Sequence, residues 1–463
     1  MTNGTTRRTF LKQSALAGVG FWAAGGLTLG AAKGANDKLN VAFAGSGGQG
    51  GGNLGAIYGM GENIVALCDI DEQRLGEAYD KVKDKNPDAK KYTDWRKMLE
   101  QKDIDAVVIS TPDHNHAIIG VSAMKLGKHV YIEKPLAHSV YESRLLRKVA
   151  AEQKVATSMG NQGTSHEGLR RAVEIIQAGI IGPVTEAHVW TNRPIWPQGI
   201  DKRPAKKDPP KGVHWDVWLG PAPERDYGDG YHPFAWRGWW DFGTGALGDM
   251  ACHTANMAFM ALKLGYPTSV EAKSSYPPNS ETFPNGATIT YQFPARGEMP
   301  PVKWVWYEGK KKVEKKVKKD NKEVTEVQEV PNIPDGGLLH GLRSNDGSGS
   351  LLIGEKGYLF SPSDYGAEYV LGFNDKFTGF QMPPKTLPRS QGHHRDWINA
   401  CKGGKPSMAN FEYAALLTEV VVLGNVALRV GKKIEWNGEE MKATNCPEAA
   451  QYVKPEVRKG WEL

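Results

Sequence analysis

Cysteine is scarce in this chain of 463 residues, which has only Cys68, Cys252, Cys401 and Cys446. Their spacing fits no zinc-binding pattern, and four cysteines are too few for the dense disulfide framework of a small secreted module. The chain is long enough for two or three domains, each with its own hydrophobic core. The sequence therefore predicts no metal site and leaves a cofactor-using enzyme open.

A strong excess of charge of one sign is also lacking. Lysine and arginine number 58 and aspartate and glutamate 52, which gives a formal net charge of +6. Much of the excess lies in residues 310–322, which hold eight lysines in thirteen residues. We therefore predict no nucleic-acid binding, and we interpret residues 309–330 as a lysine-rich insertion that forms a solvated hairpin or a flexible loop.

Acidic residues are absent before Asp37, and this N-terminal segment has the pattern of a targeting signal. Residues 6–12 read TRRTFLK, and a weakly hydrophobic run rich in glycine and alanine extends from about Ser14 to Ala32. This pattern resembles a twin-arginine export signal. We expect residues 1–35 to be a signal peptide recognised by the twin-arginine export machinery, and the protein to be periplasmic or otherwise extracytoplasmic. A disordered N-terminal tail is the alternative.

Long hydrophobic runs are missing from the rest of the chain. The N-terminal run is too rich in glycine to be a convincing spanning helix, and residues 411–430 have the pattern of a long amphipathic helix that packs on other elements. We therefore expect the mature protein to be soluble.

A glycine-rich motif follows the first buried strand. Residues 39–44 have the pattern of a buried strand, and the run GSGGQG at 45–50 follows at once and opens a helix. In this context Gly45 allows the tight turn, Gly47 lets the backbone approach a pyrophosphate, and Gly50 lets helix and strand pack closely. The helix N-terminus then faces the phosphates. The pattern predicts a dinucleotide site, with a glycine-rich structural turn as the alternative.

An acidic residue stands at the end of the second predicted strand. Asp69 follows residues 64–68 and lies 19 positions after Gly50, where a carboxylate can bind a ribose hydroxyl of the cofactor. A carboxylate there repels a 2′-phosphate, so we predict NAD and consider NADP less favoured. Arg74 lies close enough to weaken that preference.

Predicted strands and helices alternate through the first third of the chain. Strands at 106–110, 129–132 and 155–159 alternate with helices at 95–101, 116–126 and 139–152, which is typical of a parallel, doubly wound sheet. We predict an NAD-binding Rossmann domain at 36–160. Two segments at 110–116 and 133–135 follow strands of this sheet, at the edge where such sheets bind ligands.

Those two segments carry a resemblance to a known family. Thr111-Pro112-x-His114-x-His116 after one strand, with Glu133-Lys134-Pro135 after the next, resembles the Gfo/Idh/MocA oxidoreductase family over about residues 38 to 436. The resemblance implies a Rossmann domain, a C-terminal α/β domain with an open-faced, mainly antiparallel sheet, and hydride transfer with a nicotinamide cofactor. It also implies that Lys134 is the active-site lysine and Glu133 a cofactor-positioning residue, while Pro135 shapes the turn, often as a cis peptide. We place Thr111, Pro112, His114, His116, Glu133 and Lys134 among the cofactor-binding residues.

The pattern changes after Gly160. We assign residues 161–440 to a substrate-binding and oligomerisation domain, with a helix at 167–177 and strands at 184–190, 287–293 and 302–307, and residues 441–463 to a C-terminal tail. The loop at 191–244 is long enough to be functional. Seven of the fourteen tryptophans lie between Trp190 and Trp240, where indole faces can stack on sugars, although we expect most of them to fill a core or an interface.

Asp249 and His253 lie four residues apart in a predicted helix that begins at Gly245, so they share one helical face. They resemble the family's D-x-x-x-H pair, which implies that they face the nicotinamide together with Lys134. A capping aspartate beside a solvated histidine is the alternative. Metal binding by the pair needs a third ligand, and the sequence offers none that we can identify.

The predicted site supports one reaction above others. Lys134 or His253 removes a proton from a substrate hydroxyl while hydride leaves to NAD⁺, and Asp249 orients the site. We predict an NAD-dependent sugar or polyol oxidoreductase, with an NAD-dependent glycosidase and a non-catalytic sugar sensor as alternatives. The family resemblance also implies a homodimer or homotetramer.

Overall fold

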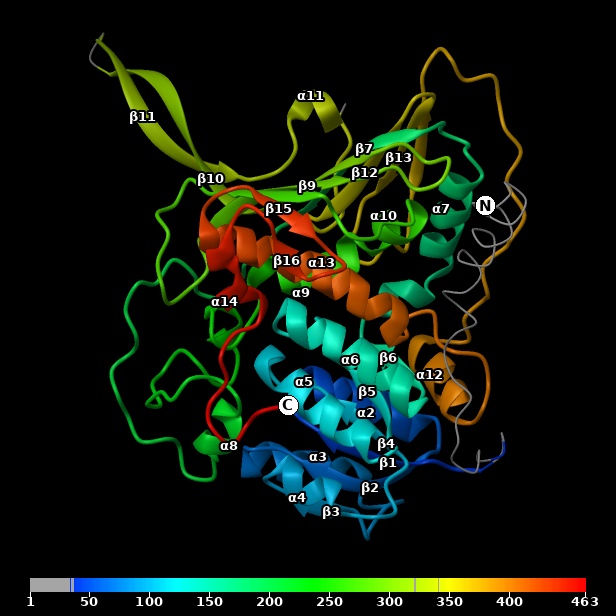
Figure 1. Cartoon of the computed structure of the whole chain (residues 1–463), viewed down its shortest axis with the longest axis vertical. Coiled ribbons are helices and arrows are strands. Elements are labelled where there is room, and N and C mark those ends of the chain that lie inside the picture. The colour runs from blue at the N-terminus through cyan, green and yellow to red at the C-terminus, as the bar shows by residue number, and fades with distance from the viewer. Residues whose placement is uncertain (1–33, 35–36, 320–321, 340) are drawn as a thin grey trace, which may run out of the picture.

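Two sheets, one in each half of the chain, organise the structure (Figure 1). The computed structural model describes residue 34 and residues 37–319, 322–339 and 341–463. The predicted signal peptide therefore falls almost wholly outside the described residues. The first sheet forms the lower part of Figure 1, and the second sheet lies across its top.

The first sheet is parallel and has the strand order β3-β2-β1-β4-β5-β6. Its strands are β1 (Asn40–Ala44), β2 (Asn63–Cys68), β3 (Lys90–Tyr92), β4 (Ala106–Ile109), β5 (His129–Ile132) and β6 (Thr157–Met159). The connecting helices are α2 (Gln49–Gly59), α3 (Glu72–Val82), α4 (Trp95–Leu99), α5 (Asp113–Lys125) and α6 (Val140–Gln153). The doubly wound sheet predicted from the alternating pattern is confirmed.

Local sequence explains where these helices begin. The side chains of Asp71 and Asp94 accept hydrogen bonds from backbone N–H groups at the starts of α3 and α4. Ser139 and Glu142 form a reciprocal capping box at the start of α6. Each cap fixes the loop between the end of a strand and the following helix. These loops lie at the carboxyl ends of the strands, where sheets of this kind bind ligands.

The second sheet has ten strands and is antiparallel except where β7 pairs with β10, as predicted. Its order is β14-β13-β12-β7-β10-β9-β8-β15-β16, and β11 pairs with β10. The strands are β7 (Val184–Thr191), β8 (Ser269–Lys273), β9 (Gly286–Phe293), β10 (Val302–Lys319), β11 (Lys322–Pro331), β12 (Gly349–Gly354), β13 (Gly357–Ser361), β14 (Val370–Phe373), β15 (Ile434–Asn437) and β16 (Lys442–Ala443).

Helices and short turns complete the second half. They are η1 (Gln162–Ser165), α7 (Glu167–Gln177), α8 (Trp215–Leu219), η2 (Ala235–Gly238), α9 (Gly245–Thr254), α10 (Asn256–Ala261), α11 (Gly336–Leu339), α12 (His393–Cys401), α13 (Phe411–Val430), η3 (Pro447–Ala449) and α14 (Ala450–Val453). The helix predicted to begin at Gly245 does begin there, but it is interrupted at Ala255, so the segment forms two helices, α9 and α10.

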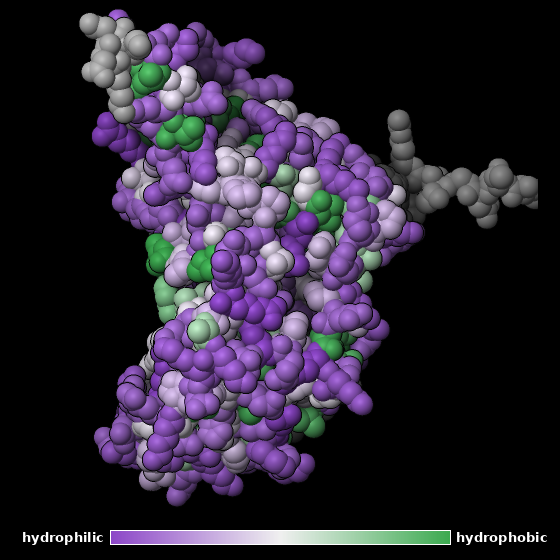
Figure 2. All heavy atoms as spheres, turned by 90° about the vertical axis from the view of Figure 1, so that its left-hand side faces the viewer, coloured by the Kyte–Doolittle hydropathy of each residue, from purple (hydrophilic) through white to green (hydrophobic). Residues whose placement is uncertain are grey.

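The lysine-rich stretch extends β10 well beyond the sheet. From Lys310 onward β10 pairs only with β11, and the two strands form an antiparallel hairpin that projects from the upper left of Figure 1. Figure 2 shows this projection at the top, where hydrophilic residues predominate with a few hydrophobic ones between them. Ion pairs cross the hairpin, as between Lys310 and Glu329 and between Lys316 and Glu323. The sequence left open whether this insertion is a solvated hairpin or a flexible loop, and the structure shows a solvated hairpin.

Helix α13 differs from its prediction as an amphipathic helix. Most of its side chains are buried on all sides, because it packs against α6 of the first half and against α9 and β8 of the second. Among the described residues it is the one helix long and apolar enough to cross a membrane by length and composition, and 78% of its apolar window is buried inside the protein.

Helix α12 also departs from its expected place. The sequence assigned it to the second half, but Trp397, Ile398 and Cys401 pack into the hydrophobic core of the first sheet, beside Tyr131 and Phe43. The helix contacts β6 and α2 (Figure 1). Its apolar side chains cover one part of that sheet, so the Rossmann core includes residues far along the chain.

Candidate functional site

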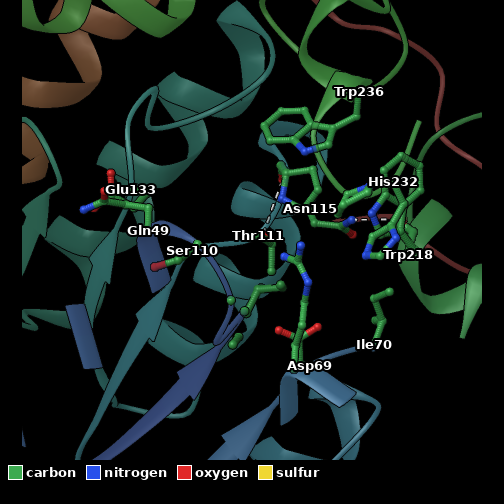
Figure 3. A pocket seen from close by; sticks show the side chains of 18 of the residues that line it. Gln49, Asp69, Ile70, Ser110, Thr111, Asn115, Glu133, Trp218, His232 and Trp236 are labelled. Carbon is green, nitrogen blue, oxygen red and sulfur yellow. Dashed lines mark hydrogen bonds between the residues drawn. The ribbon is translucent and has the colours of Figure 1, made fainter. Parts of the chain in front are cut away.

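A cavity of about 420 Å³ lies at the carboxyl edge of the first sheet and reaches the second half of the chain. Asp69 and Ile70 line one side of it, and Trp218, His232 and Trp236 line another (Figure 3). Lys134, Arg237, His253 and Tyr365 also line it. The cavity therefore joins the predicted cofactor residues to the predicted catalytic ones.

The glycine turn has the backbone that a dinucleotide site requires. Gly45 has a φ of 84°, and a Cβ at this position would lie 2.6 Å from the carbonyl oxygen of Ser110. A Cβ on Gly50 would lie 2.1 Å from the carbonyl oxygen of Gly45, so the first turn of α2 can pack here only as glycine. Gly45 and Gly47 line the cavity, whereas Gly50 is buried behind them.

Asp69 is held in place by the glycine turn itself. Its Oδ2 accepts hydrogen bonds from the Ser46 backbone N–H at 2.9 Å and from the Ser46 hydroxyl at 3.2 Å. Its Oδ1 accepts from the backbone N–H of Asp71 at 3.1 Å. Figure 3 shows the carboxylate at the end of β2, directed toward the cavity. Turn and carboxylate together fit the phosphate and ribose groups of a dinucleotide.

Glu133 is a buried carboxyl at the end of β5. It accepts hydrogen bonds from the Asn53 amide at 3.0 Å and from the Gln162 amide at 3.3 Å. Burial raises its pKa above the usual range, although Asn53 and the charge of Lys134 act in the opposite direction. The peptide bond between Lys134 and Pro135 is cis. Glu133 and Lys134, which the sequence placed among the cofactor-binding residues, both line the cavity.

Lys134 and Asp249 form an ion pair between the two halves of the chain. The Lys134 Nζ lies 2.6 Å from Asp249 Oδ1, and both side chains are largely buried. Burial raises the pKa of Asp249, but the charges of Lys134 and Arg237 outweigh it and hold the pKa well below the usual range. Asp249 is therefore ionised at neutral pH, and α9 brings it to the lysine that follows β5.

His253 lies one helical turn after Asp249 and lines the same cavity. Burial and the nearby Lys134 charge lower its pKa well below the usual range, so the imidazole is neutral at neutral pH. Its Nδ1 has no hydrogen-bond partner among the described residues. The Tyr365 ring packs against it edge-on, with the ring centroids 4.6 Å apart. A neutral imidazole in this position can accept a proton.

His114 and His116 do not reach the cavity. The ring nitrogens of His114 contact the carbonyl oxygens of Phe242 and Trp218, and those of His116 contact the carbonyl oxygens of Pro135 and Thr111. Burial lowers the pKa of His114 to about 4. Both histidines were predicted as cofactor-binding residues, but in the structure their rings bond to backbone carbonyl oxygens of neighbouring loops and do not line the cavity. Thr111 and Pro112, in contrast, line the cavity.

The sequence did not single out Arg237, Asp113, Gln162 or Tyr365. Arg237 and Asp113 form an ion pair at 3.0 Å beside the Lys134–Asp249 pair, and Arg237 lines the cavity. Two of the four had a weak signal, since Asp113 lies within the 110–116 segment and Arg237 is an arginine within the tryptophan-rich loop. Tyr365 had no comparable signal, because its loop lies far along the chain.

The tryptophans of the 191–244 loop divide as expected. Most are buried, and two of the seven between Trp190 and Trp240 line the cavity, namely Trp218 and Trp236. Trp218 packs in an aromatic cluster with Trp215 and Phe242. Within the described part of the chain, no group of three or more His, Cys, Asp and Glu residues is placed to hold a metal ion.

Two family models match the chain, one for each half. Residues 39–161 match the model described as an oxidoreductase family with an NAD-binding Rossmann fold. Residues 176–281 match the model of an oxidoreductase family C-terminal alpha/beta domain. Both models belong to the GFO_IDH_MocA set. The prediction of an NAD-binding Rossmann domain is confirmed.

Curated relatives match over parts of the chain. Levoglucosan dehydrogenase of Pseudarthrobacter phenanthrenivorans is 27% identical over 167 residues, which are 36% of this chain and 35% of that protein. A glycosyl hydrolase family 109 protein of Solibacter usitatus is 31% identical over 199 residues, which are 39% of this chain and 44% of that protein. The chain therefore spans less than half the length of these relatives.

Solved structures resemble the chain over most of its length. The WlbA dehydrogenase of Bordetella pertussis, solved in complex with NADH and UDP-GlcNAcA, has a TM-score of 0.58 over 87% of this chain and 99% of that one. The two sequences are 16% identical. At this identity the likeness shows a shared fold and nothing more.

Proposed function

The chain belongs to the Gfo/Idh/MocA oxidoreductase family, and from that premise we propose that it transfers a hydride between NAD and a hydroxyl-bearing carbon of a sugar or polyol. One observation carries this proposal. A single cavity joins the glycine turn and Asp69 to the Lys134–Asp249 pair and His253, so a cofactor site and an acid–base site share one space.

The cofactor-binding residues are those of the first sheet. The turn at Gly45 and Gly47 and the start of α2 would hold the pyrophosphate, and Asp69 the ribose hydroxyls. The Asp69 carboxylate favours NAD over NADP, because it would repel a 2′-phosphate. When bound, NAD supplies the hydride acceptor at its nicotinamide. Glu133 and Lys134 line the same cavity as the glycine turn and Asp69.

The catalytic residues divide two tasks. The Lys134 ammonium, held by Asp249 at 2.6 Å, can donate a hydrogen bond to the substrate oxygen. His253 is neutral, so its ring can accept the hydroxyl proton. Asp249 keeps the lysine oriented and balances its charge. A base positioned in this way accelerates a reaction by about 10²–10⁴-fold.

Aromatic side chains support a sugar or polyol substrate. Trp236 and Trp218 line the cavity on the side of the 191–244 loop, and His232 lies with them (Figure 3). An indole face stacks on the apolar C–H face of a sugar, while the charged groups bind hydroxyls. The similarity to a levoglucosan dehydrogenase supports this substrate class.

An NAD-dependent glycosidase is the second candidate. The similarity to a family 109 glycosyl hydrolase favours it. In this reaction the sugar would give a hydride to NAD, the C2 proton and the C1 substituent would then be eliminated, and water would add across the resulting double bond. The hydride would finally return to the sugar, so the net change would be hydrolysis. A non-catalytic sugar sensor is disfavoured by the presence of Lys134, Asp249 and His253 together in one site.

Export and assembly belong to the same proposal. The pattern at residues 6–12 supports export by the twin-arginine machinery to a periplasmic or extracytoplasmic location. Free NAD is scarce there, so the cofactor should be held tightly and recycled in place. We also infer a homodimer or homotetramer, formed through the face of the ten-stranded sheet that lies away from α9 and α13.

Nucleotide analysis and a substrate screen test the proposal together. Mature protein is denatured and its supernatant analysed for NAD(H) by mass spectrometry. The native protein is then incubated with NAD⁺ and D-glucose, myo-inositol or p-nitrophenyl glycosides, and both ketone and released aglycone are measured. Ketone with an external acceptor supports the oxidoreductase, and aglycone without net NADH supports the glycosidase. Sugar binding without either product would favour the sensor.

A further inference from the structure

Arg237 bridges two buried carboxylates beside the catalytic lysine. Its Nη1 donates to both oxygens of Asp113, at 3.0 and 3.2 Å, and its Nε lies 3.2 Å from Asp249 Oδ1. The Lys134 Nζ contacts that same Asp249 oxygen at 2.6 Å. The order Asp113–Arg237–Asp249–Lys134 therefore forms one continuous chain of ion pairs.

The surroundings of Arg237 fix the orientation of its guanidinium. The Trp236 ring lies 4.3 Å from the guanidinium carbon and the Trp196 ring 5.7 Å from it, which are cation–π distances. Asp113 is held in turn by the backbone N–H and the hydroxyl of Thr244, at 3.0 and 2.6 Å. The planar guanidinium fork can bind both carboxylates at once, which a lysine cannot do.

The chain of ion pairs joins three separate parts of the fold. Asp113 is the first residue of α5 in the Rossmann half, Arg237 lies in η2 of the 191–244 loop, and Asp249 lies in α9. Two carboxylates and two cations balance one another in a largely buried place. Without Arg237, Asp113 would lack its ion-pair partner, and Asp249 would be held from one side only.

We propose that Arg237 is a positioning residue that fixes the Asp249 carboxylate, so that the 191–244 loop completes the catalytic site when its arginine is in place. Arg237 acts through Asp249 and Lys134 rather than on the reacting atoms. The inference rests on the proposed oxidoreductase function and adds that the long loop regulates the geometry of that site.

The role of Asp249 in this proposal follows from its charge. Asp249 faces Lys134, Arg237 and His253, and the two permanent cations keep it ionised despite its burial. Removal of Arg237 should therefore raise the pKa of Asp249 and leave its carboxylate free to rotate away from Lys134. Both effects reduce the fraction of protein in which the Lys134 ammonium is correctly held.

Three variants test the proposal in the NAD-loaded, full mature protein. Arg237→Met removes the charge and the fork, and Arg237→Lys keeps the charge alone. Arg225→Met is the matched control, because Arg225 is also buried in this loop and pairs with two carboxylates, Asp241 and Glu281, but does not line the cavity. The turnover substrate is whichever of D-glucose, myo-inositol and the p-nitrophenyl glycosides the wild-type protein converts fastest.

We expect Arg237→Met to lower kcat by at least about tenfold while NAD affinity stays unchanged. The acid limb of its pH–rate profile should move to higher pH, which a purely structural role would not produce. Arg237→Lys should restore the position of the limb but only part of kcat. Arg225→Met should lower the melting temperature without changing kcat or the pH profile.

Crystal structures of the NAD complexes provide a measurement that does not depend on turnover. In Arg237→Met the distance from Lys134 Nζ to Asp249 should lengthen beyond about 3.5 Å, the limit of a hydrogen bond. A retained contact together with an unchanged kcat and acid limb would overturn the proposal. If the wild type binds NAD but converts no substrate, the proposed function fails, and the crystal structures still decide the role of Arg237. If Arg237→Met does not fold, the crystal structure of Arg237→Lys decides instead. The distance from Lys134 Nζ to Asp249 should then be longer in Arg237→Lys than in the wild type, and an unchanged distance would overturn the proposal.

Discussion

At the scale of single residues, the fold keeps two opposite charges 2.6 Å apart and largely out of water, on Lys134 and Asp249. A buried ion pair is weak evidence for stability, because desolvation offsets much of the Coulomb attraction. A catalytic role accounts for such a pair more directly, since a held ammonium is ready to donate to a substrate oxygen. Arg237 also pairs with Asp249, so loss of the lysine does not leave the carboxylate without a cation.

Lys134→Met and His253→Ala should each reduce turnover by at least about tenfold, because each removes a group that donates or accepts a proton. Bound NAD should be retained, since the glycine turn and Asp69 are untouched. Lys128→Met is a suitable control, because Lys128 is also buried in the Rossmann half, but its Nζ donates to the Ile104 carbonyl oxygen and it does not line the cavity. Steady-state rates and nucleotide content are measured for all three. Unchanged turnover in both site variants would exclude them as catalytic residues.

We expect Asp69 to set the preference for NAD over NADP. Asp69→Ala should weaken NAD binding and relax discrimination against NADP, because the group that binds the ribose hydroxyls and repels a phosphate is lost. Arg74 lines the cavity beside it, so Arg74→Ala should reduce whatever NADP binding remains. Isothermal titration with each nucleotide measures both effects. An unchanged NAD to NADP affinity ratio in Asp69→Ala would contradict this assignment.

At the scale of elements, the contact between α2 and the glycine turn decides whether the cofactor site forms. A Cβ on Gly50 would lie 2.1 Å from the Gly45 carbonyl oxygen, so the helix would have to move away from β1. At Gly52, two residues further along the same helix, an added Cβ meets nothing within 4 Å. The same substitution can therefore be compared at a crowded and an open position of one helix.

Gly50→Ala should lower the melting temperature and weaken NAD binding by at least about tenfold, as a misplaced helix N-terminus binds phosphate poorly. Gly52→Ala should bind NAD normally and be as stable as the wild type or more so, because alanine favours a helix over glycine by up to about 1 kcal/mol. Differential scanning fluorimetry with and without NAD⁺ separates the two outcomes. Equal behaviour of the variants would show that close packing at Gly50 is unimportant.

The sequence predicted the elements whose side chains repeat with a regular period. Strand β5 was predicted with its observed bounds, and α7 likewise, because buried strands and amphipathic helices leave clear patterns. The same reasoning brought Lys134, Asp249 and His253 to one site only with the help of a family resemblance. The sequence could not place Arg237 and Tyr365 in the site, because an irregular loop has no regular period from which the position of a side chain can be inferred.

At the scale of the whole molecule, buried histidines link stability to pH. Burial lowers the pKa of His114 to about 4 and that of His393 to about 3, while an unfolded histidine titrates near pH 6.5. Each folded pKa is depressed, so its contribution to stability is complete above pH 6.5 and is lost as the pH falls toward the folded value. Glu308, whose pKa burial raises to about 7, acts in the opposite sense between pH 4.5 and 7.

His393→Gln isolates one of these contributions. A glutamine amide can still donate to the Met159 carbonyl oxygen and accept from Ser165, the two partners of the imidazole. Between pH 6 and 4 the wild type should lose about 1.4 kcal/mol more unfolding free energy per pH unit than the variant, the value for one proton. Urea unfolding at several pH values measures the difference. Parallel pH dependence of the two proteins would mean that His393 takes up no proton on unfolding.

The position of α12 bears on how the protein is made. Its Trp397, Ile398 and Cys401 complete the core of a sheet whose last strand ends at Met159, so a ribosome must deliver most of the chain before that core can close. Until then the nascent first half carries an uncovered apolar surface, of the kind that chaperones bind. The nucleotide-binding domain is thus among the first parts of the protein to be synthesised and among the last to be finished.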